Sequence, residues 1–383
     1  MNANITDVAT VMVKAAKNTN WIFIELQTEH GVTGTGEASL SGSESKIAEV
    51  LPDLRAMLMG KNVLDLQPQG LSFPAAHPEA LTATVRSAVD QALWDIKSRL
   101  LEVPLWQLLG GQGSRAVPLY ANINRAALDR SPDAMARLAR QAIALGFHGV
   151  KCAPLDGLTR RTPVGRAEDK ALATALERVQ AIRQAIGPQA RLMVDCHWHL
   201  TPVLARRFVA ELEPLQLTWL EDPFPESETE EWLSLQRDTD IPLAGGERAT
   251  SLDQLARALA VGQYQICCPD VRIIGGVAPL WHAAHLISAL GAAFAPHNPR
   301  GPIGTLASAH VCAAVPDLLF LEFPFAECSW RSELVSGSEV IDHGNLVLPR
   351  KPGVGAQIEE ALVEAHPYDR VVPPNQASGI DIW

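Results

Sequence analysis

The chain has 383 residues, 47% of them hydrophobic and 20% charged, so it can bury a large core and form one large domain with a smaller one. Its formal net charge of −11 argues against a nucleic-acid partner, because no basic stripe exists to displace counterions from a polyanion. No apolar run reaches the roughly 18 residues of a membrane span, and the amino-terminal segment MNANITDVAT lacks the basic and apolar regions of a signal peptide. We therefore expect a cytoplasmic protein with no membrane partner.

Residues 1–115 are predicted to form an α+β unit. A strand signal over residues 21–26 leads into closely spaced glycines, which is typical of a hairpin or meander in an antiparallel sheet. Apolar residues then recur at helical spacing over residues 85–101. The segment that ends this unit contains Pro104 and a pair of adjacent glycines.

From residue 116 to residue 344 the pattern changes to a regular alternation of strand and helix. Ser131 and Pro132 mark one helix start, as an N-cap and a first helical residue. Eight such units predict a TIM barrel, whose chemistry lies at the carboxyl ends of the strands. An open doubly wound sheet is the alternative fold. The six cysteines show no C-x-x-C spacing, so we expect reduced core residues rather than disulfides or zinc ligands.

The remaining residues, 345–383, are rich in glycine and proline and contain no ninth strand and helix unit. We expect this tail to return to the amino-terminal unit. The predicted domains are therefore residues 1–115 completed by residues 345–383, and a barrel formed by residues 116–344.

Three apolar runs in the middle of the chain each end on a carboxylate, and these acids are Asp195, Glu221 and Glu247. They are 26 residues apart in both steps, which suits one parallel strand plus its return helix. Adjacent parallel strands lie about 4.8 Å apart, so acids at their carboxyl ends can converge on one point. Three hard oxygen ligands placed in this way suit Mg²⁺. The alternative is that each acid is a helix N-terminal charge or a solvated loop residue.

The chain resembles the enolase superfamily, in its mandelate racemase-like branch. The segments that carry the resemblance span nearly the whole chain and are GVTGTGEA, ALWDIKSRLLEVPLWQLLGG, VDCHW, LEDPF, GGER, PDVRIIGGV and PGVG. The resemblance implies a modified TIM barrel with an α+β capping domain, and Mg²⁺ held by Asp195, Glu221 and Glu247. It also implies that the enzyme removes a proton alpha to a substrate carboxylate while the metal holds the enediolate.

Removal of such a proton needs a base beside the metal. His297 ends the seventh predicted strand and Asp270 ends the sixth, so the carboxylate can hold one ring nitrogen and leave the other for substrate. The pair resembles the His-Asp dyad of the family, matched by PDVRIIGG and APHNPRGPIG. The alternative is that His297, which follows a proline, only caps a loop.

The second strand departs from the racemases of this family, which carry K-x-K where this chain has Lys151, Cys152 and Ala153. Alanine cannot move a proton, so a two-base racemase or a Lys-based cycloisomerase is disfavoured. Lys151 remains a candidate that lines the site or helps to hold the metal carboxylates.

The third strand supplies His197, two residues after Asp195. Because side chains alternate along a strand, the two residues should point to the same face and into the barrel mouth. The D-x-H arrangement resembles acid sugar dehydratases of the galactonate dehydratase type, in which the matching histidine is the acid that assists departure of the 3-hydroxyl. His199 has the same phase and is a candidate substrate contact, although a loop residue is the alternative.

Five further residues are candidates for binding substrate. Glu322, which ends the eighth strand, resembles the carboxylic acid that hydrogen-bonds the substrate carboxylate, and pairing with a basic neighbour is its alternative role. Asn122 and Asn124, at the end of the first strand, could take sugar hydroxyls. Arg160 and Arg161 lie in a long segment after the second strand that could close over an anionic substrate, or form a solvated basic loop.

Together these features predict a Mg²⁺-dependent hydro-lyase that converts an aldonate or aldarate, its small-molecule acid sugar partner, into a 2-keto-3-deoxy acid. In this hypothesis His297 removes the C2 proton and His197 protonates the leaving 3-hydroxyl. One alternative is an epimerase or cycloisomerase in which His197 returns the proton. Another is a binding protein on a retired enzyme scaffold, against which the intact ligands and dyad count. We also expect a homo-oligomer.

Overall fold

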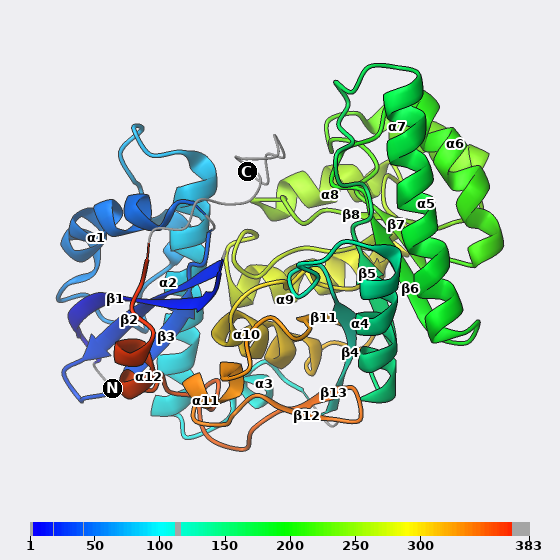
Figure 1. Ribbon diagram of the computed structural model, residues 1–383. Coiled ribbons are helices and arrows are strands. Elements are labelled where there is room, and N and C mark those ends of the chain that lie inside the picture. Colours follow the sequence, from blue (N-terminus) through cyan, green and yellow to red (C-terminus); the bar gives the residue numbers. More distant parts are fainter. Residues whose placement is uncertain (1–2, 18, 41, 112–115, 370–383) are drawn as a thin grey trace.

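The computed structural model describes residues 3–17, 19–40, 42–111 and 116–369. The chain forms two units, and Figure 1 shows the smaller one, drawn in blue and cyan, beside a barrel drawn from teal to gold. None of the helices in the described residues combines the length and apolar character needed to cross a membrane.

The smaller unit is an antiparallel sheet of three strands with two helices packed on it. Its elements are β1 (Ile5–Ala16), β2 (Thr19–Thr28), β3 (Thr33–Glu37), α1 (Glu44–Leu58), the 3₁₀ turn η1 (Pro68–Gly70), α2 (Glu79–Leu100) and α3 (Leu105–Leu108). Alternate residues of β2 enter two different cores. Ile22 and Ile24 pack with the helices of this unit, whereas Trp21 and Phe23 pack in the core shared with the barrel. This is why β2 reads as a continuous apolar run instead of an alternating one.

The larger unit, within the described residues, is a closed barrel of eight parallel strands. The strands are β4 (Ala116–Asn122), β5 (Gly149–Cys152), β6 (Arg191–Asp195), β7 (Trp219–Glu221), β8 (Leu243–Gly245), β9 (Ile266–Cys267), β10 (Ala293–Phe294) and β11 (Leu321–Pro324). Neighbours pair in parallel from β4 to β10, β11 pairs with β4, and a bridge between Phe294 and Leu318 closes the ring. The predicted TIM barrel with an α+β cap is confirmed, and the open sheet is wrong.

Helices cover the outside of the barrel, as expected for a chain that returns after each strand. They are α4 (Pro132–Ala144), α5 (Arg166–Ile186), α6 (Pro202–Leu212) with the 3₁₀ turn η2 (Glu213–Leu215), α7 (Thr229–Asp238), α8 (Leu252–Ala260), α9 (Val277–Ala289) and α10 (Pro302–Cys312). The first starts as predicted, because the side chain of Ser131 accepts the N–H of Ala134 and Pro132 occupies the first helical position.

The tail first adds to the barrel and then reaches the smaller unit. Its elements are α11 (Arg331–Leu334), β12 (Val340–Asp342), β13 (Asn345–Val347) and α12 (Glu360–Ala365). β13 pairs antiparallel with β4, so the predicted boundary between residues 344 and 345 falls inside this hairpin. Farther on, the N–H of Val354 donates to Asp95 of α2 at 2.8 Å, and α12 lies against β1 (Figure 1). Residues 370–383, also assigned to the cap, lie outside the described residues.

The interior of the barrel is filled by side chains. Tyr120, Met193 and Trp219 are fully buried there, and the rings of Tyr120 and Trp219 meet edge to face with centroids 5.4 Å apart, a geometry that aromatic pairs prefer. The barrel is therefore a packed core and not a pore. Charged groups at the carboxyl ends of the strands lie above this apolar floor, and the indole N–H of Trp219 donates to Glu221 at 2.8 Å.

Candidate active site

The three acids predicted as metal ligands lie at the carboxyl ends of adjacent strands. Asp195 and Glu221 are the last residues of β6 and β7 and are neighbours in the parallel register. Glu247 lies two residues beyond the end of β8. The exposed fractions of the three are 2%, 1% and 6%. Burial of several carboxylates is costly unless cations compensate them, so the positive groups nearby decide what this cluster can do.

Lys151 is the cation at the centre of this cluster. Its Nζ lies 2.6 Å from Oε1 of Glu221, 3.0 Å from Oε1 of Glu322 and 3.9 Å from Oδ2 of Asp195, and the side chain is fully buried. Burial alone would lower the pKa of Lys151, but the carboxylates of Glu221 and Glu322 raise it well above its ordinary value. Lys151 therefore stays charged and acts as a counter-ion rather than as a base.

The compensation by Lys151 is incomplete at Glu221. Burial raises the pKa of Glu221 to about 7; Lys151 opposes the shift, and the carboxylates of Asp195, Glu322 and Glu247 add to it. Repulsion among neighbouring carboxylates is relieved by a proton or by a further cation. The cluster thus has the electrostatic character of a site for a divalent ion.

The acids are held by side-chain cations in the present arrangement. Nε2 of His197 lies 2.9 Å from Oδ2 of Asp195. Nε2 of His297 lies 3.0 Å from Oε2 of Glu247. As they stand, no three His, Cys, Asp or Glu side chains among the described residues are grouped so that they could hold a metal ion. The donor set nevertheless fits Mg²⁺ in kind and placement, with hard carboxylate oxygens on adjacent strand ends. Binding would require these side chains to leave their imidazole partners.

His297 and Asp270 form the predicted pair. Each lies three residues beyond its strand, β10 and β9 respectively, and Nδ1 of His297 lies 2.8 Å from Oδ2 of Asp270. Burial alone would raise the pKa of Asp270, but Arg272 and the imidazole lower it. Asp270 is therefore an ionised acceptor, and this places the ring proton on Nδ1 of His297.

The other ring nitrogen of His297 faces Glu247. Burial alone would lower the pKa of His297, but Glu247 and Glu322, with the hydrogen bond to Asp270, raise it to about 10. The imidazole is thus protonated at neutral pH while Glu247 holds it. Without this contact to Glu247, Nε2 of His297 would be free to accept a proton.

His197 reaches the acids by a route that strand alternation does not describe. β6 ends at Asp195, and His197 and Trp198 adopt left-handed backbone conformations with φ of 45° and 59°. Such conformations are strained in residues other than glycine and concentrate at functional sites. The turn folds the imidazole back onto Asp195, whose Oδ1 also accepts the N–H of His197 at 3.0 Å. Burial alone would lower the pKa of His197, but Asp195 raises it, so the ring is a proton donor in the barrel mouth.

Glu322, Asn122 and Asn124 connect strand ends. Oε1 of Glu322 accepts from Nδ2 of Asn122 at 2.6 Å, and Oε2 accepts the N–H of Asn298 at 2.8 Å. Oδ1 of Asn124 accepts the N–H of Ala153 at 2.7 Å. The structure therefore brings Glu322 and Asn122 to the carboxylate cluster through Lys151, and places Asn124 between β4 and β5.

His199 lies next to His197 but is turned toward a loop. The centroids of the two rings are 6.2 Å apart, and the His199 side chain hydrogen-bonds the backbone of Leu155. Burial and the neighbouring His197 lower the pKa of His199, so its ring is neutral. His199 therefore lines the barrel mouth beside the segment that connects β5 to α5.

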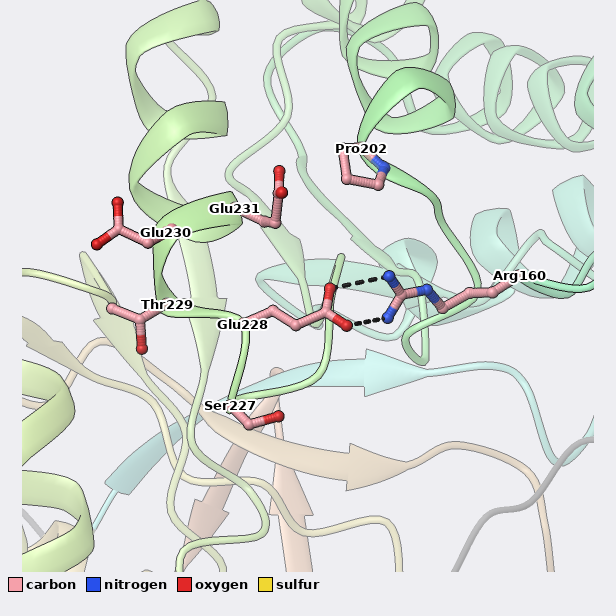
Figure 2. Close-up of a pocket in the computed structure, with 7 residues that line it drawn as sticks. All are labelled: Arg160, Pro202, Ser227, Glu228, Thr229, Glu230 and Glu231. Carbon is pink, nitrogen blue, oxygen red and sulfur yellow. Dashed lines mark hydrogen bonds and ion pairs between the residues drawn. The ribbon is translucent and has the colours of Figure 1, made fainter.

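Arg160 lies on the rim of the barrel. Its guanidinium pairs with both carboxylate oxygens of Glu228, at 2.5 and 2.9 Å, as Figure 2 shows. The pocket at this place has a volume of about 360 Å³ and is lined by Arg160, Pro202 and residues 227–231. Arg161 is exposed. No described contact joins either arginine to the carboxylate cluster or to the dyad.

Arg272 is a site residue that the sequence analysis missed. It is 1% exposed, it forms an ion pair with Oδ2 of Asp270, and its backbone N–H donates to Oδ1 at 2.8 Å. Its Nη1 also donates to the carbonyl oxygen of Ser39, in the smaller unit, at 2.7 Å. The spacing Asp-x-Arg directly after a strand was the available signal.

Trp198 and Arg248 form a second unpredicted contact. The guanidinium lies 3.7 Å from the centroid of an indole ring of Trp198, and Nε of Arg248 lies 3.6 Å from Oε1 of Glu247. An Arg over an aromatic face gains a favourable cation–π interaction. The pair connects the strained turn after β6 to the acid after β8.

Comparisons with known proteins agree with this architecture. Residues 3–110 match the family model for the mandelate racemase / muconate lactonizing enzyme N-terminal domain, and residues 134–362 match the model described as enolase C-terminal domain-like. A D-xylonate dehydratase from Haloferax volcanii is 32% identical over 380 residues, covering 95% of this chain and 89% of the relative. A D-galactonate dehydratase from Ralstonia pickettii is 30% identical over 359 residues, covering 90% of each. The solved structure of a mandelate racemase/muconate lactonizing enzyme-like protein from Roseovarius sp. TM1035 has a TM-score of 0.87 at 27% identity, covering 96% of both chains.

Proposed function

Because the chain belongs to the mandelate racemase / muconate lactonizing enzyme family of the enolase superfamily, we propose that it is a Mg²⁺-dependent dehydratase of acid sugars. Its product would be a 2-keto-3-deoxy acid formed from an aldonate or an aldarate. The relatives named D-xylonate and D-galactonate dehydratase support this class of reaction. Within the chain, the observation that carries the proposal is that two imidazoles, His297 and His197, contact different carboxylates of one cluster.

The two imidazoles have different tasks in this proposal. Nδ1 of His297 is fixed by Asp270, so Nε2 is the atom that takes the proton when the C2–H bond of the substrate breaks. His197 is charged beside Asp195 and gives its proton to the 3-hydroxyl, so that the C3–O bond breaks and water leaves. The resulting enol then tautomerises to the 2-keto acid. The overall change is the loss of one water, made of the proton from C2 and the hydroxyl from C3.

Asp195, Glu221 and Glu247 are the residues that would hold the metal. Enzymes of this superfamily generally use a divalent metal, and Mg²⁺ bound here would supply positive charge to the substrate carboxylate as negative charge grows at C2. Lys151 remains paired with Glu221 and Glu322 and limits the repulsion within the cluster. His297 would be released from Glu247 as this carboxylate turns to the ion.

An epimerase is the second candidate, and the position of His197 is the observation that favours it. The imidazole of His197, which contacts Asp195 while that of His297 contacts Glu247, could return a proton to C2 in place of expelling the hydroxyl. Ala153, at the place of the second lysine of two-base racemases, leaves His197 as the partner for that role.

A substrate screen tests the proposal. The purified protein with Mg²⁺ is incubated with a library of aldonates and aldarates that includes D-xylonate and D-galactonate, and 2-keto acid is measured with semicarbazide. We expect keto acid from one or a few related sugars and none from His297→Asn. A C2 epimer without keto acid would support the second candidate. Absence of keto acid and of C2 exchange in deuterium oxide across the library would contradict both.

A further inference from the structure

The two barrel helices that follow the dyad residues begin without a side-chain cap of their own. α9 starts after Gly276 and α10 after Gly301, and glycine has no side chain that could accept the first N–H groups. These groups have no partner inside a helix, and they are costly to bury unpaired. Gly276 lies six residues after Asp270, and Gly301 lies four residues after His297. Whatever satisfies these two helix starts therefore also holds the loops that carry the dyad.

Glu37, the last residue of β3 in the capping unit, satisfies the start of α10. Its Oε1 accepts the N–H of Gly301 at 2.7 Å and its Oε2 accepts the N–H of Gly304 at 2.8 Å, while the side chain is fully buried. A Cβ on Gly301 would lie 2.7 Å from both oxygens, so the absence of a side chain lets the carboxylate approach. Gln91 of α2 fixes Glu37 in turn, through hydrogen bonds with its backbone N–H and carbonyl oxygen.

Asp90 of α2 satisfies the start of α9 in the same way. Its carboxylate accepts the N–H of Ala278 at 3.2 Å and the N–H of Val277, and the residue is 3% exposed. Gly276 has a φ of 104°, and a Cβ there would collide with Asp90. One turn earlier on α2, Ser87 accepts the N–H of Gly275 at 3.0 Å. Two carboxylates of the capping unit thus end on two successive barrel helices, which face it in Figure 1.

The helix starts are among the connections that fix the loops of the dyad, together with Asn298, the residue after His297, whose N–H donates to Glu322 at 2.8 Å. β9 and β10 are each only two residues long, and Asp270 and His297 both lie beyond their ends. The hydrogen bond between Nδ1 of His297 and Asp270 crosses from one loop to the other. A shift of either first helical turn would therefore be expected to change this bond. A third connection runs through Arg272, which contacts both Asp270 and the carbonyl oxygen of Ser39.

We propose that Glu37 and Asp90 are positioning residues for the dyad. By holding the first turns of α10 and α9, the capping unit sets the distance and orientation of His297 relative to Asp270, in addition to covering the barrel. This inference rests on the proposed function, since it takes His297 as the base. Misplacement of a reacting group by about 1 Å can cost about 100-fold in rate, so the effect of these buried carboxylates should reach the chemistry.

Two isosteric variants and a matched control test the proposal. Glu37→Gln and Asp90→Asn each replace a carboxylate oxygen by an NH₂ group, which cannot accept a backbone N–H. The control is Asp95→Asn, which makes the same chemical change on α2, the helix that also carries Asp90. Asp95 is also fully buried and accepts two backbone N–H groups, from Val354 at 2.8 Å and Thr35 at 3.3 Å. It also pairs with Arg99. Its contact with β3, at Thr35, is the longer of the two, and no described contact joins Asp95 to a helix that follows the dyad.

The first readout needs no substrate. The Nδ1–H proton of His297 is observed by NMR and assigned by its loss in His297→Gln. We expect this resonance to shift or broaden in Glu37→Gln and in Asp90→Asn and to stay in place in Asp95→Asn, although all three variants should unfold at lower urea concentration than the wild type. Should one cap variant fail to fold, the other carries the comparison with Asp95→Asn.

The second readout is the rate of C2–H exchange on the substrate found in the screen. We expect the kcat of this exchange to fall about tenfold or more in both cap variants. Its KM should stay within about twofold, since the groups that bind the substrate are unaffected. Asp95→Asn should keep the wild-type kcat. An unchanged His297 resonance in both cap variants, or an equal change in Asp95→Asn, would overturn the proposal. Inactivity of the wild type would instead contradict the proposed function, and the NMR comparison would still decide on the positioning role.

Discussion

Nε2 of His297 lies 3.0 Å from Oε2 of Glu247, so the proposed base and a proposed metal ligand hold each other in this structure. His197 and Asp195 have the same relationship at 2.9 Å. Each imidazole would therefore compete with a bound cation for its carboxylate. Occupation of the carboxylate cluster by a divalent ion and release of the two histidines are expected to be the same event.

Glu247→Gln tests the metal assignment. Loss of one carboxylate charge should weaken Mg²⁺ binding by more than about tenfold and abolish turnover, while the barrel stays folded because strand ends carry function rather than core packing. Titration calorimetry with Mg²⁺ and far-UV circular dichroism measure the two effects. Glu228→Gln, whose carboxylate pairs with Arg160 on the rim, is the control and should bind Mg²⁺ normally. EDTA should inactivate the wild type reversibly, and full activity after thorough chelation would refute the assignment.

Asp270→Asn tests the dyad. The amide keeps the size of the side chain but removes the charge that orients His297 and stabilises its protonated form. We expect kcat to fall by roughly 10- to 100-fold or more, with a smaller change in KM. The carboxylate raises the pKa of His297, so its loss should move the acidic limb of the kcat/KM profile to lower pH. An unchanged rate and an unchanged profile would make Asp270 a bystander.

Lys151→Met tests the counter-ion. Removal of the ammonium leaves Glu221 and Glu322 buried without their shared cation, and breaking a buried ion pair on one side costs about 3–5 kcal/mol of unfolding free energy. Urea denaturation measures the loss. Lys14→Met, whose ammonium pairs with the exposed Asp369, is the control and should change stability by less than about 1 kcal/mol. Similar stabilities for the two variants would show that Lys151 does not balance the cluster.

His310 should make stability depend on pH. Its Nδ1 accepts the N–H of Trp106 at 3.1 Å and its other ring nitrogen contacts the carbonyl oxygen of Val354 at 3.2 Å. Burial lowers the pKa of His310 to about 4, although the Val354 hydrogen bond opposes the shift. An unfolded histidine has a pKa near 6.5, so between these values the unfolded chain binds the extra proton. The stabilisation is complete above pH 6.5 and is lost as the pH falls toward 4, a total of about 3 kcal/mol.

Replacement of this histidine measures the effect. His310→Gln cannot titrate, so its unfolding free energy should fall less steeply than that of the wild type between pH 6.5 and 4. His343→Gln, at a side chain that is 91% exposed, should keep the wild-type slope. Equal slopes for His310→Gln and the wild type would contradict the linkage.

The strand ends were the part of the site that a single sequence could predict. Asp195 and Glu221 each close a short apolar run before a turn and a helix, and this local pattern is enough to place them side by side in the parallel register. Asp270 and His297 follow the same pattern on the next strands, and their side chains lie in contact. Closure of the barrel followed from the repeat of these units, because each one is complete within its own stretch of sequence.

Contacts between segments that are distant in the chain could not be predicted from the sequence. Glu37 lies at the end of a predicted strand, and nothing near it indicates that it accepts the N–H of Gly301, 264 residues later, just before α10. The path of His197 depends on a left-handed turn, which sequence patterns predict poorly for residues other than glycine. Trp21 seemed part of an ordinary strand, and its burial on the barrel side depends on how the two units meet.

Hydrogen exchange at C2 in deuterium oxide, followed by NMR on the substrate found in the screen, tests the roles of the two histidines most directly. His297→Asn should show neither exchange nor keto acid, because no proton leaves C2. His197→Asn should gain deuterium at C2 in the unreacted sugar while little keto acid accumulates, because His297 still removes the proton but the hydroxyl lacks its acid. Exchange that survives the loss of His297 and vanishes with the loss of His197 would contradict the account and place the base on the third strand.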